Sequence, residues 1–337
     1  MRAKVARSRR VAAISMLLLA AIGGAYAARP PRHIQPPVTS PVTVLYAGSL
    51  STVMEESVGP AFQLKAGYLY RGEGQGSVGA ANMIRDRLRT PDIFISADPA
   101  VNDRLLIGPT NSDMVRWYLA FASGEMVIGY NPKSRFAPDF AAAKAGAKNW
   151  YDVLTMPGVR FGRADPELDP KGYRTLFLFS LAETFYHRPG MSAFLGQPQN
   201  PAQVFPEPEL LARMETGQID AGIFYRHEVQ AHGIPFISLP PELNQSDPAL
   251  APLYATQSFT NDHGITIHGS PIIFTITIPV RAPNPAGAES FVLFLLSAEG
   301  RDRLHSAGFN NLPVKAAYDM GQIPMAIRRL VQTQYPK

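Results

Sequence analysis

The sequence predicts an α/β protein built from two lobes, each a mainly parallel sheet flanked by helices. Its 337 residues suit two domains of ordinary size, and 46% of them are hydrophobic, which is enough for two cores. From residue 42 onward, apolar runs typical of buried strands alternate with helical patterns. The same alternation restarts near residue 157, and apolar strand and helix patterns return after residue 272. A chain that leaves one lobe, builds another and returns is typical of a two-lobed protein with a hinge.

The first lobe is predicted from five elements in a regular order. We expect strands at 42–46, 67–71 and 92–96, and helices at 50–64 and 78–88. Because strand, helix, strand, helix, strand is the order of a parallel sheet, the carboxyl ends of these strands should meet at one edge. Ligands of open parallel sheets bind beyond that edge.

The remaining elements build the second lobe and complete the first. We expect a strand pair, the opening strand of the second lobe, a returning strand and two helices, at 117–130, 157–162, 272–278, 286–296 and 298–307. This order predicts that the chain crosses between the lobes twice.

The crossings define the predicted domains. Residues 42–123 together with 272–337 form lobe 1, and residues 124–271 form lobe 2. We expect the hinge crossings near 123–129 and 269–274. The ligand cleft then lies between the lobes.

The first 27 residues have the pattern of a secretory signal peptide. Five basic residues precede an apolar run at 11–22, and Ala25-Tyr26-Ala27 matches a cleavage site. We expect cleavage near Ala27/Ala28, followed by a Pro-rich tether over 28–41. This predicts a periplasmic protein, and no later apolar run is long enough to span a bilayer.

Charge and cysteine content exclude several functions. The five basic residues of the signal segment account for the whole formal net charge of +5, so the mature part is close to neutral. Nucleic-acid binding then loses its main electrostatic support. The chain has no cysteine, which excludes disulfides, cysteine-ligated metals and a lipid-anchored N-terminal cysteine. We expect a monomer.

Two Gly-Ser turns indicate an anion-binding site. Gly48-Ser49 follows the first predicted strand, and Gly76-Ser77 precedes the second predicted helix. The first N–H groups of a helix lack intrahelical partners and lie at the positive end of its dipole. Glycine lets the backbone approach a ligand, and a serine hydroxyl can turn toward it. The alternative is that both serines are ordinary N-caps.

A long motif resembles the molybdate/tungstate-binding proteins of ABC importers. Residues 159–176, VRFGRADPELDPKGYRTL, look like the signature of that family. Further matches occur in the family's order and spacing: AGSLS at 47–51, GSVGAANMIRDRL at 76–88, DIFISADP at 92–99, GQIDAGIFYRHEV at 217–229 and ITIPVRAPNP at 276–285. The resemblance implies a type II periplasmic-binding fold that closes on molybdate or tungstate and delivers it to a membrane permease. It also implies a protein that is not an enzyme and needs no cofactor.

The resemblance assigns ligand-binding roles in both lobes. Ser49 and Ser77, each after its glycine, are the ligands expected from the first lobe. The second lobe is expected to contribute a helix start and a phenolic donor, at Asp169, Gly172, Tyr173, Arg174 and Tyr225.

The second carboxylate of the family is missing from its matching position. In archaeal-type members, two carboxylates complete an octahedral metal centre, and Asp169 matches one of them. The position that matches the other is Phe224. A hydrogen-bonded tetrahedral cradle therefore stays open as the alternative, with Asp169 either a ligand of the oxyanion's metal centre or a helix cap.

Other functions are weaker or remain open. Residues 74–79 satisfy G-x-G-x-x-G, the fingerprint of a nucleotide-dependent enzyme, but they follow the second strand of the lobe rather than the first. There is no G-x-S-x-G elbow of a hydrolase and no histidine spacing typical of zinc. Sulfate, phosphate, ferric ion and organic anions bind to proteins of the same fold and remain alternative ligands.

Overall fold

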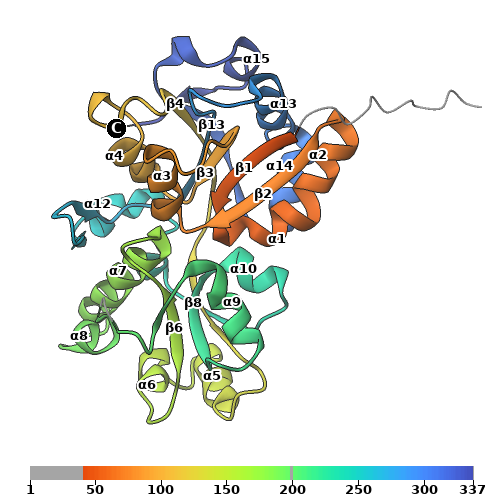
Figure 1. Cartoon of the computed structure of the whole chain (residues 1–337). Helices are drawn as coiled ribbons and strands as arrows, with labels where there is room; N and C mark the ends of the chain where they lie inside the picture. The colour runs from red at the N-terminus through yellow and green to blue at the C-terminus, as the bar shows by residue number, and fades with distance from the viewer. Residues whose placement is uncertain (1–40, 198–199, 337) are drawn as a thin grey trace, which may run out of the picture. The chain divides into compact units, whose positions relative to one another are not determined.

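The computed structural model describes residues 41–197 and 200–336. The predicted signal peptide, its cleavage site and the tether up to residue 40 lie outside these residues. Within the described residues, the strands form a seven-stranded sheet, a five-stranded sheet and a two-stranded ribbon. Helices flank both larger sheets (Figure 1). The chain has the predicted two-lobed α/β fold.

The seven-stranded sheet has the order β14-β13-β4-β12-β3-β1-β2. Its strands are β1 (Pro41–Ala47), β2 (Leu69–Gln75), β3 (Ile93–Ser96), β4 (Trp117–Ser123), β12 (Ile273–Thr277), β13 (Asn310–Tyr318) and β14 (Thr333–Gln334). The helical segments of the same parts of the chain are η1 (Gly48–Leu50), α1 (Ser51–Val53), η2 (Met54–Val58), α2 (Gly59–Ala66), α3 (Ser77–Arg85), α4 (Pro99–Leu105), η3 (Pro109–Asn111), α13 (Pro285–Leu295), α14 (Ala298–Ser306), η5 (Met320–Gln322) and α15 (Met325–Arg328).

The five-stranded sheet has the order β7-β6-β8-β5-β9. Its strands are β5 (Met126–Tyr130), β6 (Phe161–Ala164), β7 (Val204–Phe205), β8 (Ala221–Tyr225) and β9 (Phe236–Ser238), and the ribbon pairs β10 (Ser258–Thr260) with β11 (Thr266–His268). The helical segments are α5 (Ala137–Lys144), α6 (Trp150–Leu154), α7 (Pro170–Phe185), α8 (Met191–Leu195), α9 (Glu207–Glu215), α10 (Arg226–Ala231), α11 (Pro241–Asn244), η4 (Pro248–Leu250) and α12 (Ala251–Tyr254).

Both sheets are mixed rather than mainly parallel, which corrects the sequence-based prediction. In the first, β1 pairs in parallel with β2 and β3, but β12 runs antiparallel to β3 and β4. In the second, β6 pairs in parallel with β8, but β5 runs antiparallel to β8 and β9. The reason is the connection between the sheets: a strand that enters from the end where its neighbours finish must run opposite to them.

Two predicted strands begin later than expected. The strand expected at 67–71 is β2, and the one expected at 157–162 is β6. Gly67 (φ 74°) and Gly158 (φ 84°) adopt left-handed backbone conformations that a strand cannot contain. Gly67 ends α2 in this way, so β2 starts only after the turn. The predicted lobe boundaries and hinge crossings stay predictions.

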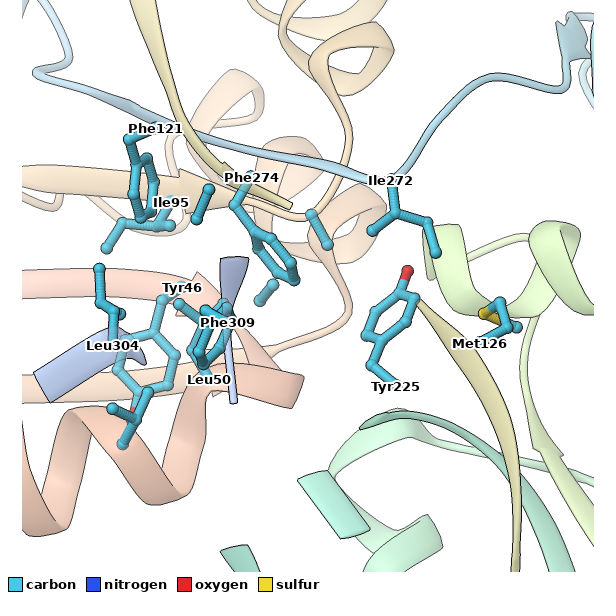
Figure 2. Packing of buried hydrophobic residues seen from close by; sticks show 14 of the residues in the cluster. Tyr46, Leu50, Ile95, Phe121, Met126, Tyr225, Ile272, Phe274, Leu304 and Phe309 are labelled. Atoms are coloured by element: carbon cyan, nitrogen blue, oxygen red, sulfur yellow. The ribbon is translucent and has the colours of Figure 1, made fainter. Parts of the chain in front are cut away.

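The main hydrophobic core contains residues of both large sheets. It joins Tyr46 and Phe274 of the first sheet to Tyr225 of the second (Figure 2). The Phe274 ring lies 5.2 Å from Phe309 and 6.0 Å from Tyr225, measured between centroids. A polar residue, His227, also packs here, with its ring stacked 3.8 Å from Phe309. The apolar packing therefore reaches the end of β8, where a predicted site residue lies.

Among the helices of the described residues, none is both long enough and apolar enough to span a membrane.

Phe274→Ala should lower the free energy of unfolding by about 3–5 kcal/mol, because it leaves a cavity in a fully buried cluster. Urea unfolding followed by circular dichroism measures the change. Phe194→Ala is the control, since that side chain is 62% exposed and its loss should cost less than about 0.5 kcal/mol. Equal losses for the two variants would contradict the assignment of Phe274 to the core.

His227 should make stability depend on pH. Burial, with a further contribution from Lys171, lowers the pKa of His227 to about 3. The unfolded chain takes up a proton at His227 below a pH of about 6.5, whereas the folded chain does not, so this residue destabilises the fold as the pH falls from about 6.5 toward 3. His227→Gln should flatten that part of the curve of melting temperature against pH. The exposed His305→Gln should leave the curve unchanged.

Candidate functional site

The strand register of the first sheet brings the two Gly-Ser turns to one edge. Ala47 pairs with Gln75 at the ends of β1 and β2. The next residue after each strand is a glycine, and a helical segment starts there. The structure thus places Ser49 and Ser77 at neighbouring strand ends.

Ser77 lies fully buried in the first turn of α3 and does not cap the helix. The N-cap residue is Gly76, and the cap makes no side-chain hydrogen bond. Ser77 Oγ instead accepts a hydrogen bond from the N–H of Ala97, 3.1 Å away, directly after β3. The interpretation of Ser77 as an ordinary N-cap is therefore wrong.

Ser49 is also buried and does not cap its helix. It lies inside η1, whose N-cap residue is Ala47 and has no side-chain cap bond. Ser49 Oγ has no hydrogen-bond partner among the described residues, although the residue is only 8% exposed. A buried hydroxyl without a partner is costly, so this oxygen is available to a ligand or water.

Asp169 is shared by two helix N-termini. Its Oδ1 accepts the N–H of Lys171 (2.7 Å) and so caps α7, one of the two roles that the sequence leaves open. Its Oδ2 accepts the N–H of Ser77 (3.2 Å) at the start of α3. One residue earlier, the carbonyl of Leu168 accepts the N–H of Gly79 (3.0 Å). The carboxylate therefore occupies a position where two helix dipoles favour negative charge.

The pKa of the Asp169 carboxyl is raised by its surroundings. Burial is the main cause, and the nearby carboxylate of Glu207 adds to it, while hydrogen bonds from Lys171 and Ser77 act in the opposite direction. The hydrogen bonds from the two helix N-termini thus only partly offset the rise in the pKa of Asp169 that burial causes.

A buried lysine neutralises further acidic groups beside Asp169. Lys171 Nζ donates to Glu207 Oε1 (3.0 Å) and to Glu228 Oε1 (2.7 Å). Glu228 Oε2 accepts the N–H of Tyr225 (2.7 Å) and so fixes the start of α10. Burial alone would lower the pKa of Lys171, but the two glutamates raise it, so this ammonium stays charged.

The sequence-based site did not include Lys171, Glu207 and Glu228. Two of them lie inside quoted motifs, at 159–176 and 217–229, and a buried lysine beside Asp169 could have been suspected there. Glu207 lies in a Pro-Glu-Pro-Glu stretch outside these motifs.

Tyr173 and Arg174 bind Asp98 across the lobes. Tyr173 Oη donates to Asp98 Oδ2 (2.9 Å), and Arg174 Nη2 donates to the same oxygen (2.7 Å). Asp98 also caps α4 by accepting the N–H of Ala100 (2.9 Å). This geometry ties α7 to the seven-stranded sheet, and contact of Tyr173 or Arg174 with a ligand stays a prediction.

Two of the predicted glycines are required by close backbone approach. A Cβ on Gly172 would overlap the backbone of Asp165 and Pro166, and a Cβ on Gly76 would lie 2.5 Å from the carbonyl oxygen of Leu168. Any larger residue would push α7 or α3 out of place. Their contribution to the site is thus to let two backbones meet.

Tyr225 ends β8 with its hydroxyl buried and unpartnered within the described residues. Burial raises its pKa well above the ordinary value, so the phenol stays protonated and can donate. Figure 2 shows it beside Phe274 and Ile272. The neighbouring Phe224 packs in a separate core cluster with Val127, and its ring lies 5.6 Å from Lys171 Nζ.

Several buried polar atoms of this region lack a partner in the part of the chain that the structure describes. They are Ser49 Oγ, Arg174 Nε, Glu207 Oε2, Tyr225 Oη and both ring nitrogens of His227. Buried polar groups in proteins are almost always hydrogen-bonded, so such a concentration indicates a place for a bound polar ligand or water. Within residues 41–197 and 200–336, no group of three or more histidines and carboxylates is arranged to hold a metal ion.

A family model matches most of the length of the chain. Residues 42–310 match the family model described as bacterial extracellular solute-binding protein. A Haloferax volcanii protein that carries a provisional name as the molybdenum-binding protein of an ABC transporter is 35% identical over 285 residues, covering 84% of this chain and 85% of its own. The molybdate/tungstate-binding protein WtpA of Thermococcus kodakarensis is 30% identical over 319 residues, covering 86% and 87%.

Solved structures share the fold at low sequence identity. The periplasmic molybdate-binding protein of Azotobacter vinelandii is 15% identical, with a TM-score of 0.57, covering 80% of this chain and 98% of its own. The sulfate-binding protein SubI of Mycobacterium tuberculosis is 14% identical, with a TM-score of 0.50, covering 86% and 89%. The predicted resemblance to molybdate/tungstate-binding proteins is confirmed, and the chain belongs to the bacterial extracellular solute-binding protein family.

Proposed function

We propose that this protein captures a tetrahedral oxyanion, molybdate or tungstate, and delivers it to an ABC-type permease. The observation that carries the proposal is the set of buried, unpartnered polar atoms next to the N-termini of α3 and α7, with Ser49 Oγ and Tyr225 Oη as hydroxyl donors. Hydroxyl groups can donate hydrogen bonds to an anion without a metal cofactor, whereas the first N–H groups of α3 and α7 already bind Asp169.

The choice of anion is supported by the relatives, not by the fold. Two relatives with names that refer to molybdenum or to molybdate and tungstate cover most of this chain. The sulfate-binding neighbour has the same fold, so the lobes alone do not select the ligand. Sulfate, phosphate, ferric ion and organic anions are the alternatives that binding measurements must separate.

Domain closure is the mechanism that we infer. Hydrogen bonds that bridge the two lobes surround the site: Asp169 with Ser77, Arg174 with Asp98, and Thr52 Oγ1 with His232 Nε2 at 2.7 Å. An anion held by donors from both lobes stabilises this closed arrangement over an open one, because only the closed arrangement offers all of its contacts.

The remaining features of the proposal follow from the family. A solute-binding protein needs no catalytic residues and no cofactor, and we propose neither for this chain. We propose export to the periplasm with cleavage near Ala27/Ala28, a monomeric state, and docking of the closed form to a permease in the inner membrane.

Calorimetric titration of the mature protein with four anions tests the ligand. Molybdate or tungstate should bind with a Kd below about 1 μM, while sulfate and phosphate bind at least about a hundredfold more weakly. If only sulfate or phosphate binds tightly, that anion is the ligand in place of molybdate or tungstate. If none of the four anions binds, the oxyanion assignment is overturned.

Ser49→Ala should weaken molybdate binding by about 1.5–3 kcal/mol, the range for hydrogen bonds to charged groups. Because Ser49 Oγ has no partner in the described residues, the variant should unfold at nearly the same urea concentration as the wild type. Calorimetry and urea unfolding measure the two effects. Ser306→Ala, at an exposed serine of α14, is the matched control. Unchanged affinity in Ser49→Ala would remove this hydroxyl from the site.

A further inference from the structure

We propose that His232, at the C-terminal end of α10, is a latch that holds the two lobes closed from outside the anion site. The latch is its hydrogen bond to Thr52 of lobe 1, and Glu215 at the end of α9 is the residue that positions the histidine ring. The inference goes beyond the proposed function, because it concerns the lobes alone and holds for any anion that the site takes.

Three side chains form one line of hydrogen bonds between the lobes. His232 Nε2 lies 2.7 Å from Thr52 Oγ1, and His232 Nδ1 lies 2.7 Å from Glu215 Oε1. Thr52 belongs to α1, which follows β1 of the seven-stranded sheet, whereas α9 and α10 contact β8 of the five-stranded sheet. Figure 1 shows α10 beside α1, and the two helices are in contact. The bond between Thr52 and His232 therefore joins the lobes.

The carboxylate of Glu215 decides which ring nitrogen of His232 carries the proton. An ionised carboxylate can only accept hydrogen bonds, so Nδ1 carries a proton and donates it to Glu215. In the neutral ring Nε2 is then the acceptor, and the hydroxyl of Thr52 donates to it. Because Glu215 fixes the tautomer and the orientation of the ring, less entropy is lost when the bond across the lobes forms. Both ring nitrogens are engaged, so neither is left for an anion.

The two ends of α10 differ in burial. At its start, His227 is buried and stacked on Phe309, and a Cβ on Gly124, near the predicted hinge crossing at 123–129, would lie 3.8 Å from its Nδ1. His232 follows five residues later, roughly 7.5 Å along the helix, and its side chain is 24% exposed. The helix is thus anchored in the core near the hinge, and its accessible end can be released without loss of core packing.

The latch favours closure with or without an anion, because its atoms bond to one another and not to the groups proposed for the anion. One hydrogen bond of ordinary net strength changes the ratio of closed to open molecules about two- to tenfold. A ligand that binds only the closed form has an apparent Kd equal to its intrinsic Kd divided by the closed fraction. The latch should therefore tighten the binding of every anion by the same factor.

Spin labels on the two lobes test the latch in the protein alone. The chain has no cysteine, so Leu64→Cys in α2 and Ala141→Cys in α5, both at exposed positions, place one label on each lobe. Double electron–electron resonance then measures the distances between the labels with and without Thr52→Val, which replaces the hydroxyl by a methyl group. The ratio of long to short distances should rise about two- to tenfold in Thr52→Val. Thr110→Val, at an exposed threonine of the same lobe, is the control and should leave the distances unchanged.

Further variants separate a latch from a purely structural role. Thr52→Ser keeps the hydroxyl and should restore the distances of the wild type. His232→Ala should shift the distances as Thr52→Val does, and the double variant should shift them no further, because both changes remove the same bond. Glu215→Ala should act only while the hydroxyl of Thr52 is present. Unchanged distances in Thr52→Val, or additive shifts in the double variant, would overturn the proposal.

Calorimetry with molybdate and tungstate separates the latch from the proposed function. If the wild type binds both anions, Thr52→Val should raise both dissociation constants by the same factor, at most about ten, and leave their ratio unchanged. A changed ratio would place Thr52 in the anion site and overturn the latch. If neither anion binds to the wild type, the proposed function fails, and the distances between the labels in the protein alone still decide the latch.

Discussion

The carboxylate of Asp169 is the interaction on which the site depends. It accepts the first N–H groups of α7 and α3, two helices that approach from different sheets. The geometry is possible only because Gly76 and Gly172 leave room for the backbones to meet. A single negative group therefore fixes both the position of two positive helix ends and the contact between the lobes.

Charge balance is the second constraint. Asp169, Glu207 and Glu228 are buried close to one ammonium, that of Lys171. Burying charges is costly unless each is paired and hydrogen-bonded, and here nearly every oxygen is. Among the buried atoms of this region without a partner in the described residues are Ser49 Oγ and Tyr225 Oη, the two hydroxyls that the proposed function assigns to the anion. A site with fixed, unsatisfied groups loses little entropy when the ligand binds.

The fold and the individual side chains make different contributions to anion binding. A molybdate-binding protein and a sulfate-binding protein both share this fold at about 15% identity. Helix N-termini favour any anion, because the dipole does not distinguish sulfur from a metal. Discrimination between anions must therefore come from individual side chains and from the volume that the closed lobes leave.

The sequence by itself determined the alternation of strands and helices, the two Gly-Ser turns and the family, because these depend on local periodicity and contiguous motifs. Tertiary structure decided the rest. The sheets are mixed because β12 enters from the end where β3 finishes. Tyr173 and Arg174 bond to Asp98, far away in the chain. Glu207 pairs with Lys171, and α9 contacts η1, because folding brings together segments that are far apart in the chain and that no local pattern connects.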